Sequence, residues 1–469
     1  MRALVTRRSW VSLGLLAGLA ALGVTAPGRG VPSGDEGTGT HASVASLPAP
    51  SRAVATGAAP AAPLTGDGIE PPGASARATE WIVEPGTDLP TVAEALERAR
   101  DGDRIVVRSG IYTEPTLVVD KTVELVGEGR PVLDGLGERQ IMTLVADGVS
   151  VVGFVFRNVG VSFVEDRSAI KVDEAMDCLI RDNRIEDAFF GIYLANSGGC
   201  RILNNELIAH GSRESQSGNG IHLWYSRDVT IRGNRIEGHR DGIYFEFVED
   251  SHVEDNESRH NLRYGLHFMF SDRCQYHRNV FAENGAGVAV MYTRDIVVKD
   301  NLFDRNWGNA SFGMLLKDIT DSELTGNTFR QNSVGIVAEG SNRLDVSGND
   351  FVENGWAIKL MANSQDNVFS RNNFVGNSFD VSTNSRRTYS SFEGNYWDAY
   401  RGYDLDRDGV GDVPFRPVRL FSLIVEQNEP SLVLLRSFFV TILDAAERVL
   451  PVLTPETLVD ERPLMEKIQ

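Results

Sequence analysis

Carboxylates near the C-terminal end of the sequence have the spacing of a calcium-binding loop. Acidic side chains stand at positions 1, 3, 5 and 9, a main-chain carbonyl stands at position 7, and Gly409 stands at position 6, where such a loop turns sharply. The five ligand positions are Asp404, Asp406, Asp408, Val410 and Asp412. Phe415 replaces the bidentate Glu expected at position 12. The segment predicts either a structural Ca²⁺ site or an acidic turn without metal.

A second set of residues combines imidazole, thioether, aromatic and charged side chains within similar apolar segments. Its members are His222, Trp224, Tyr244, Glu246, His267, Met269, Met291 and Lys317. Thioether sulfur and imidazole nitrogen suit soft Cu(I), and His267, Met269 and Met291 are the candidate ligands. Methionine also makes adaptable contacts at protein interfaces. Either role requires that elements distant in the sequence bring these side chains together.

An internal repeat of about 22 residues supplies those elements. In each repeat an Asn is followed two positions later by an apolar or aromatic residue, except that Ser258 takes that place after Asn256. We call the residues at one position of successive repeats a column. The Asn column comprises Asn183, Asn205, Asn234, Asn256, Asn279, Asn301, Asn327, Asn349, Asn372 and Asn395. Asn tolerates left-handed backbone and can stack its amide on a neighbour, so this column predicts the tight turn between two strands.

A column of Gly followed by an apolar residue accompanies the Asn column. It comprises Gly191, Gly220, Gly242, Gly265, Gly287, Gly313 and Gly335, with Ala357 in the same place. Apolar residues alternate after each Gly, as in Ile221-His222-Leu223, which is strand periodicity. Repeats this short leave no room for crossover helices, and the dense leucine pattern of leucine-rich repeats is missing. The sequence therefore predicts an all-β protein, a right-handed single-stranded parallel β-helix.

The alternation also predicts which side chains of the strand after Gly point outward. Successive rungs lie about 4.8 Å apart, so Trp224, Glu246, Met269 and Met291 are expected to form an exposed stripe. Both long repeats insert residues just before this strand, at His210 to Gly218 and at Trp307 to Phe312. Three interpretations stay open: a docking face for a partner, a copper site, and a stripe buried beneath these loops.

Both ends of the predicted β-helix have capping signals. Residues 91–100 have helical spacing and are expected to cover the first rung, and Leu432 to Val449 has an apolar helical stripe that can cover the last. The β-helix is thus expected at residues 80–398. A mixed and helical extension with the acidic loop is expected at 399–469.

The N-terminus resembles an export signal. Arg2, Arg7 and Arg8 precede an apolar run from Trp10 to Val24, which is short for a membrane span. We expect a signal peptide at residues 1–26, with an uncleaved N-terminal anchor as the alternative. Residues 27–79 are rich in Ala, Pro and Gly and predict a disordered tether. Export implies a periplasmic protein.

The net charge and the positions of the cysteines exclude some kinds of binding partner and ligand. The formal net charge of -19 makes a nucleic-acid partner unfavourable. Cys178, Cys200 and Cys274 each stand five residues before a column Asn, where Val229 and other apolar residues stand elsewhere. This position predicts interior stacking residues rather than ligands, with a disulfide between Cys178 and Cys200 as the alternative.

Several segments have a pattern more specific than the repeat: Arg263–Ser271, Gly287–Tyr292, Leu315–Ile319, Gly394–Asp398, the acidic loop, Pro414–Pro417 and Asp460–Met465. Through these segments the chain resembles, over about residues 80–469, the NosD family of periplasmic maturation factors of nitrous oxide reductase. The resemblance implies a non-enzymatic platform without catalytic residues. It also implies work with an ABC-type ATPase, its membrane subunit and a copper chaperone in assembling the copper–sulfide centre of the reductase.

A carbohydrate-active enzyme is the main alternative, because polysaccharide lyases and uronate epimerases use the same fold. Such an enzyme needs a general base and a cationic group in one place. The stripe offers Glu246, Lys317, Glu339 and Lys359, but these stand on several different rungs. A non-enzymatic surface adhesin is a third interpretation.

Overall fold

The computed structural model describes residues 78–162, 164–211, 213–385, 389–435, 437–449 and 458–469 of the 469-residue chain. Residues Ala78–Gln469 form one compact unit. The expected signal peptide and anchor, and the expected tether apart from residues 78 and 79, lie outside the described residues. No described helix is long and apolar enough to cross a bilayer.

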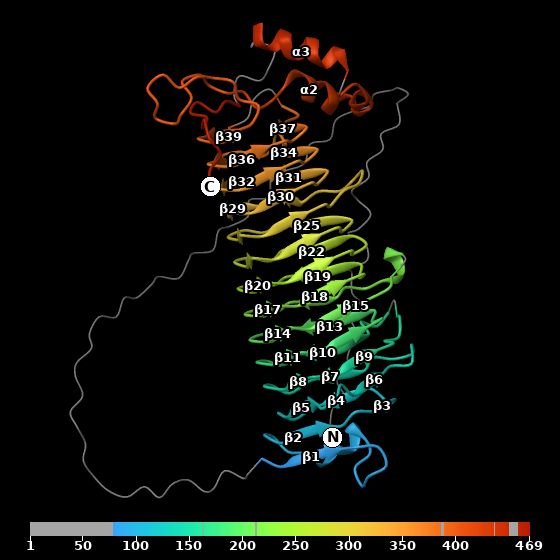
Figure 1. The fold of residues 1–469 in the computed structure, drawn as a ribbon. Helices are drawn as coiled ribbons and strands as arrows, with labels where there is room; N and C mark the ends of the chain where they lie inside the picture. The colour runs from blue at the N-terminus through green and yellow to red at the C-terminus, as the bar shows by residue number, and fades with distance from the viewer. Residues whose placement is uncertain (1–77, 163, 212, 386–388, 436, 450–457) are drawn as a thin grey trace, which may run out of the picture. The chain divides into compact units, whose positions relative to one another are not determined.

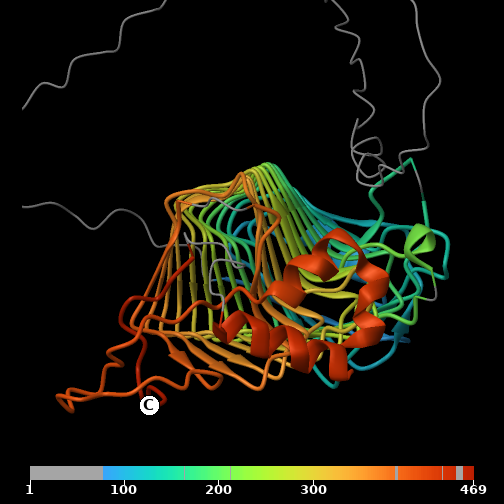
Figure 2. The same cartoon turned by 90° about the horizontal axis from the view of Figure 1, so that it is seen from above.

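Three parallel sheets wind around a common core, and each strand pairs with its equivalent one turn before and one turn after (Figure 1). Figure 2, which looks along the stack, shows the turns superimposed. Sheet A has 14 strands: β1 (Glu80–Val83), β2 (Arg104–Val107), β5 (Glu124–Gly127), β8 (Ser150–Val152), β11 (Leu179–Arg181), β14 (Arg201–Leu203), β17 (Thr230–Arg232), β20 (His252–Glu254), β23 (Gln275–His277), β26 (Val297–Lys299), β29 (Thr320–Thr325), β32 (Asn342–Ser347), β35 (Val368–Ser370) and β38 (Ser391–Glu393).

Sheet B follows sheet A in each turn and has 13 strands: β3 (Ile111–Tyr112), β6 (Val132–Asp134), β9 (Val155–Arg157), β12 (Arg184–Glu186), β15 (Glu206–Ile208), β18 (Arg235–Glu237), β21 (Glu257–Arg259), β24 (Val280–Ala282), β27 (Leu302–Asp304), β30 (Thr328–Arg330), β33 (Asp350–Val352), β36 (Asn373–Val375) and β39 (Tyr396–Trp397). Sheet C contains or directly follows the Gly column and has 12 strands: β4 (Leu117–Val119), β7 (Met142–Leu144), β10 (Ser168–Asp173), β13 (Phe190–Ala195), β16 (Ile221–Trp224), β19 (Asp241–Glu246), β22 (Tyr264–Met269), β25 (Ala286–Met291), β28 (Met314–Lys317), β31 (Val334–Glu339), β34 (Trp356–Leu360) and β37 (Phe379–Ser382). The prediction of a parallel β-helix is confirmed.

The core consists of columns of like residues, because in-register stacking brings the same repeat position together on each turn. In sheet B the rings of Phe303, Phe329, Phe351 and Phe374 stack with centroids 4.5 to 5.0 Å apart. Cys178, Cys200 and Cys274 are fully buried free thiols. The prediction that they are interior residues is confirmed, and the disulfide alternative is not present.

The Asn column forms a continuous buried ladder between sheets A and B. The side-chain oxygen of each Asn after Asn183 accepts hydrogen bonds from the main-chain and side-chain N–H groups of the Asn one turn before, as Asn301 does from Asn279 at 2.9 and 3.0 Å. The left-handed residue of this turn is the one before each Asn, for example Asp300 with φ 56°. The predicted stacking is confirmed, but the left-handed backbone stands one residue earlier than expected.

Helix α1 (Val92–Arg98) covers the first turn, as predicted. The hydroxyl of Thr91 caps this helix by accepting a hydrogen bond from the Glu94 N–H. Val92, Ala95 and Leu96 are buried in the main core. The predicted range was two residues too long at its C-terminal end, where Ala99 and Arg100 are not helical.

The C-terminal end differs from the expectation that Leu432 to Val449 covers the last rung. Helix α2 (Leu420–Gln427) packs on the outer face of β34 and β37, where its Phe421 and Val425 form a buried cluster with Phe379. A 3₁₀ segment, η3 (Glu429–Leu434), and helix α3 (Phe438–Val449) follow and pack on α2 (Figure 1). The last Asn of the ladder is covered instead by Asp460, to which Asn395 donates from its main chain and its side chain.

Candidate functional site

The outer face of sheet C carries two columns of the predicted site residues. In the first, His222, Tyr244 and His267 are in register on β16, β19 and β22. The second column consists of residues that pair in register on five successive strands: Trp224, Glu246, Met269, Met291 and Lys317. Every residue of the second column is partly exposed. The structure therefore brings the predicted residues together in the expected order.

The first column is not an exposed stripe. Tyr244 and His267 point outward from the sheet, as the alternation predicts, but they are only 8% and 6% exposed. Asn219, directly after the first insertion, donates a 3.0 Å hydrogen bond to His222 Nδ1. Phe312, the last residue of the second insertion, stacks on Tyr264 at 6.1 Å, and the Tyr264 ring lies 4.9 Å from that of His267. The outer face of sheet C thus has a covered column of two imidazoles and one tyrosine. Beside it lies the open second column, called the thioether column here because Met269 and Met291 stand at its centre.

A buried ion pair fixes the orientation of His267. Asp241 is fully buried, and Arg263 donates to both of its carboxylate oxygens. His267 Nδ1 lies 3.7 Å from Asp241 Oδ2 and 3.3 Å from Arg263 Nη2. Burial favours the neutral acid, but the hydrogen bonds from Arg263 and His267 hold the pKa of Asp241 below its ordinary value. This carboxylate is ionised and holds the Nδ1 side of the imidazole.

The other imidazole nitrogen of His267 has no hydrogen-bond partner although it is buried. Burial lowers the pKa of His267, with Asp241 opposing only in part, so the ring is neutral at pH 7. Because a guanidinium can only donate, the 3.3 Å contact with Arg263 makes Nδ1 an acceptor and leaves the proton of the neutral ring on Nε2. The tautomer usual for metal-binding histidines, with a free Nε2 lone pair, requires Nδ1 to donate to Asp241 instead. Met269 and Met291 stand beside His267 on the open column.

An exposed aromatic ladder borders the thioether column, and the sequence analysis did not identify it. Its members directly follow the second column, and their rings stack with centroids 4.5 to 5.2 Å apart. They are Tyr225, Phe247, Phe270 and Tyr292. All four have left-handed backbone, with φ between 47° and 56°, which turns the rings out of the sheet. The signal was available in the sequence as an aromatic residue at a fixed position of four successive repeats.

The four charged residues that the sequence offers for an enzymatic site, Glu246, Lys317, Glu339 and Lys359, do not gather at one point. Lys317 lies 3.8 Å from Glu339, and Lys359 lies 3.8 Å from Glu426 on α2, so each lysine has its own carboxylate. Glu246 accepts a 3.4 Å hydrogen bond from the Tyr244 hydroxyl, and burial raises its pKa. This distribution gives no support to a lyase or epimerase site on the stripe.

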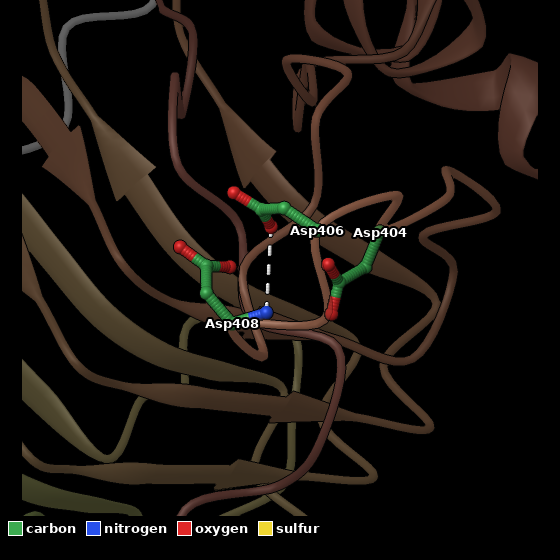
Figure 3. A group of neighbouring side chains, drawn as sticks. All are labelled: Asp404, Asp406 and Asp408. Carbon is green, nitrogen blue, oxygen red and sulfur yellow. Dashed lines mark hydrogen bonds between the residues drawn. The ribbon is translucent and has the colours of Figure 1, made fainter.

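The acidic loop brings three of the predicted calcium ligands together (Figure 3). Carboxylate oxygens of Asp404, Asp406 and Asp408 lie within 4.8 Å of one another. The charge of Asp408 raises the pKa of Asp406, because two carboxylates this close repel each other, and a cation between them would relieve that repulsion. Asp412 accepts a hydrogen bond from the Leu405 N–H at 2.7 Å and thereby closes the loop.

Phe415, at the position where a calcium loop has Glu, has a structural role instead. It exchanges main-chain hydrogen bonds with Asp460, and its ring packs on Trp397 at 5.2 Å. The ligand expected at position 12 is absent because this position holds the C-terminal segment on the last rung. The loop therefore lacks the carboxylate that a calcium loop has at position 12.

Comparison with known proteins identifies the relatives of this chain. The model of the NosD family, described as periplasmic copper-binding protein, matches residues 208–402. A probable ABC transporter binding protein NosD of Pseudomonas aeruginosa is 33% identical over 79% of this chain and 90% of that protein. The protein of the same name from Stutzerimonas stutzeri is 27% identical over 74% of this chain and 84% of that protein.

Two solved structures share the fold. A family 28 exopolygalacturonase of Yersinia enterocolitica has a TM-score of 0.51 at 10% identity, over 68% of this chain and 79% of that one. The pre-mature bacteriophage phi29 gene product 12 has a TM-score of 0.50 at 12% identity, over 65% of this chain and 50% of that one. These identities show a common architecture alone, whereas the NosD relatives match nearly their whole length. The chain belongs to the NosD family.

Proposed function

We propose that this chain is the periplasmic, non-enzymatic component of an ABC-transporter-linked complex that assembles the copper–sulfide centre of nitrous oxide reductase. The observation that carries the proposal is the neutral His267 imidazole, held by Asp241 beside Met269 and Met291. The family description as copper-binding and the names of the relatives as ABC transporter binding proteins support it. The ATPase, its membrane subunit, a copper chaperone and the reductase are the proposed partners.

Copper is cargo in this proposal. Two thioethers and one imidazole form a soft ligand set that favours Cu(I) over divalent ions. Binding at His267 Nε2 requires the tautomer with the proton on Nδ1, so this nitrogen must exchange the hydrogen bond from Arg263 for one that it donates to Asp241 Oδ2, 3.7 Å away. Because Met269 and Met291 are partly exposed, a donor protein has access to the sulfur side of the site. The aromatic ladder next to it supplies an apolar border for that encounter.

Replacing Met269 or Met291 with Leu is expected to weaken Cu(I) binding at least tenfold. Leu retains the apolar volume, so the β-helix should remain folded while one sulfur ligand is lost. Competition with a chromophoric Cu(I) chelator measures the affinity. Met361→Leu, which follows Lys359 on the outer face at the far end of the solenoid, is the matched control. Equal loss in M361L would place the copper elsewhere.

The exposed apolar face of α3 is the proposed contact with the membrane subunit. Phe438, Phe439 and Ile442 are 78%, 46% and 50% exposed, and Val433 in η3 is 87% exposed. An apolar patch of this kind usually marks an interaction surface. The double substitution F438S/I442S is expected to reduce co-purification with the membrane subunit at least tenfold while leaving Cu(I) affinity unchanged. V164S, at a 90% exposed position far from α3 in the sequence, should have no effect.

The acidic loop is the proposed Ca²⁺ site. Affinities of exported calcium modules lie around 10⁻⁴ to 10⁻³ M, so 10 mM Ca²⁺ is expected to raise the free energy of unfolding by about 1 to 3 kcal/mol over EGTA. Thermal melts of the wild type and of D404N/D406N, with and without Ca²⁺, measure this. The stabilisation should vanish in the double variant. If wild type and variant respond equally, the loop is an acidic turn without metal.

The test of the function as a whole is the metal content of nitrous oxide reductase from a strain lacking this gene. We expect reductase without its catalytic copper–sulfide centre but with its other copper centre retained. Restoration by the wild-type gene and not by H267Q would connect the activity to the candidate site. Fully loaded, active reductase from the deletion strain would overturn the proposal, and incubation with alginate or pectate would then test the carbohydrate alternative.

A further inference from the structure

A second amide ladder runs along the turn between sheets B and C. Its members are Asn261, Asn284, Asn306, Asn332, Asn354 and Asn377. The side-chain oxygen of each member after Asn261 accepts from the Asn one turn before, as Asn332 does from Asn306 at 3.1 and 3.0 Å. Each amide thus satisfies its neighbour, and the first member, Asn261, accepts from His239 instead of an Asn.

Histidines replace asparagine at the N-terminal end of this ladder. Ile208, Glu237 and Arg259 are in register on β15, β18 and β21. Two residues further along each strand stand His210, His239 and Asn261, so the two imidazoles occupy consecutive ladder positions. The His239 main-chain N–H donates to Asn261 Oδ1 at 3.1 Å and continues the ladder on that side. The ladder stops here, because the chain leaves the turn after His210 for the first insertion.

The His239 ring has no partner in the structure. It is 0% exposed, and both of its nitrogens are buried without a hydrogen bond. Burial lowers the pKa of His239 to about 4, so the ring is neutral at pH 7 and carries one lone pair. Buried polar groups are almost always satisfied by protein, water or a ligand. The unpaired imidazole of His239 is thus an exception that a water or a ligand in an adjoining cavity would remove.

A cavity of about 170 Å³ adjoins His239, and its lining contains further ligands. Asp187 and His210 line it, together with Gln216 and Ser217 of the insertion. His210 Nδ1 donates to Asp187 Oδ1 at 2.8 Å, which leaves His210 Nε2 unused by that hydrogen bond. Asp187 and the nearby carboxylates of Glu186 and Glu237 make the surroundings of His210 favourable to a cation.

We propose that His239, His210 and Asp187 bind one divalent transition-metal ion of the Zn²⁺ class, which takes the place of the missing amide at the end of the ladder. Two imidazoles and one carboxylate are a common ligand set for Zn²⁺, and they lack the sulfur that Cu(I) prefers. The ligand atoms of the three residues do not yet lie within 4.8 Å of one another. The side chain of His210 is 77% exposed, so it can turn toward His239 without disturbing the core.

The ion would stabilise the insertion that leads into the first column of sheet C. Gln216 and Ser217 line the cavity, and two residues later Asn219 donates to His222 on the covered column. Binding at the ladder end thus stabilises the segment that lies beside His222 and Tyr244. This role is independent of the proposed function, because it concerns the fold of this chain whichever cargo the chain carries.

The experiment is titration of the purified full chain with Zn²⁺ by calorimetry, in 5 mM Ca²⁺ to occupy the acidic loop. Co²⁺ serves as the spectroscopic probe, because a site with two imidazoles and a carboxylate gives visible d–d absorption. The decisive variant is H239N, which extends the amide ladder by one member and so removes the ligand while keeping the turn satisfied. H210A tests the exposed ligand, and H252N, at an exposed histidine on β20, is the matched control.

Wild type and H252N are expected to bind one Zn²⁺ with micromolar or tighter affinity. H239N and H210A should bind it at least 100-fold more weakly and lose the Co²⁺ absorption. H267Q should bind Zn²⁺ like the wild type, which separates this site from the copper proposal. Equal Zn²⁺ binding by wild type and H239N, or a Zn²⁺-soaked crystal with only water against His239, would overturn the inference.

Discussion

Asp460→Ala is expected to lower the free energy of unfolding by about 3 to 5 kcal/mol. Asp460 is fully buried, and its Oδ2 accepts hydrogen bonds from Asn395 N, Asn395 Nδ2 and Trp397 Nε1 at 3.0 to 3.1 Å. Its Oδ1 accepts from the Gly394 N–H at 3.1 Å. Each donor left unpaired in the interior costs about 1 to 3 kcal/mol, with some relief from water at the end of the solenoid.

The loss should spread beyond the mutated residue, because a solenoid frays from an open end. Guanidinium unfolding followed by circular dichroism measures the total change, and hydrogen exchange at Asn372 and Asn395 shows whether the last rungs open first. Asp460→Asn retains one acceptor oxygen and should lose about half as much. Glu461→Ala, at an exposed neighbouring position, is the control. A loss below about 1 kcal/mol in D460A would contradict the capping role.

Asp380→Asn is expected to abolish a loss of folding stability that the wild-type chain shows as the pH rises, and that originates in the last turn. Asp380 stands in the column that holds Gly335 and Ala357 on the two preceding turns, and it is buried. Burial raises its pKa from 3.8 to about 7, with Asp398 adding to the rise and Arg419 opposing it. The folded chain therefore keeps a proton that the unfolded chain releases above pH 3.8. Stability is lost as the pH rises from about 4 to 7, where Asp380 ionises in the folded state.

The neutral amide of Asn mimics the protonated acid at every pH. The stability advantage of D380N over the wild type should therefore grow by about 3 kcal/mol between pH 5 and pH 8 and then level off. Differences in denaturant midpoint at pH 5, 6, 7 and 8 measure it, and other titrating groups cancel in the comparison. D345N, at an exposed carboxylate of sheet A, should show no such trend. A constant difference across this range would show that Asp380 is already ionised at pH 5.

The sequence alone determined the solenoid and its register, because both depend on local periodicity. Every turn repeats the same Asn, Gly and alternating apolar positions, and in-register stacking then follows for all turns at once. This is why spacing along the chain was enough to predict the order Trp224, Glu246, Met269, Met291 and the buried place of the three cysteines. In a repeat protein, residues one repeat apart in the sequence are neighbours in space, so contacts can be predicted from the spacing alone.

The tertiary structure decided everything that departs from the repeat. The burial of His267 and the ion pair of Asp241 with Arg263 depend on how non-repeated loop residues fold over sheet C. The cover of the Asn ladder comes from Asp460, 65 residues after Asn395. The place of α2 on β37 likewise follows from packing between segments without periodic relation. Contacts of this kind are set by shape, desolvation and unpaired donors in three dimensions, which spacing along one chain does not encode.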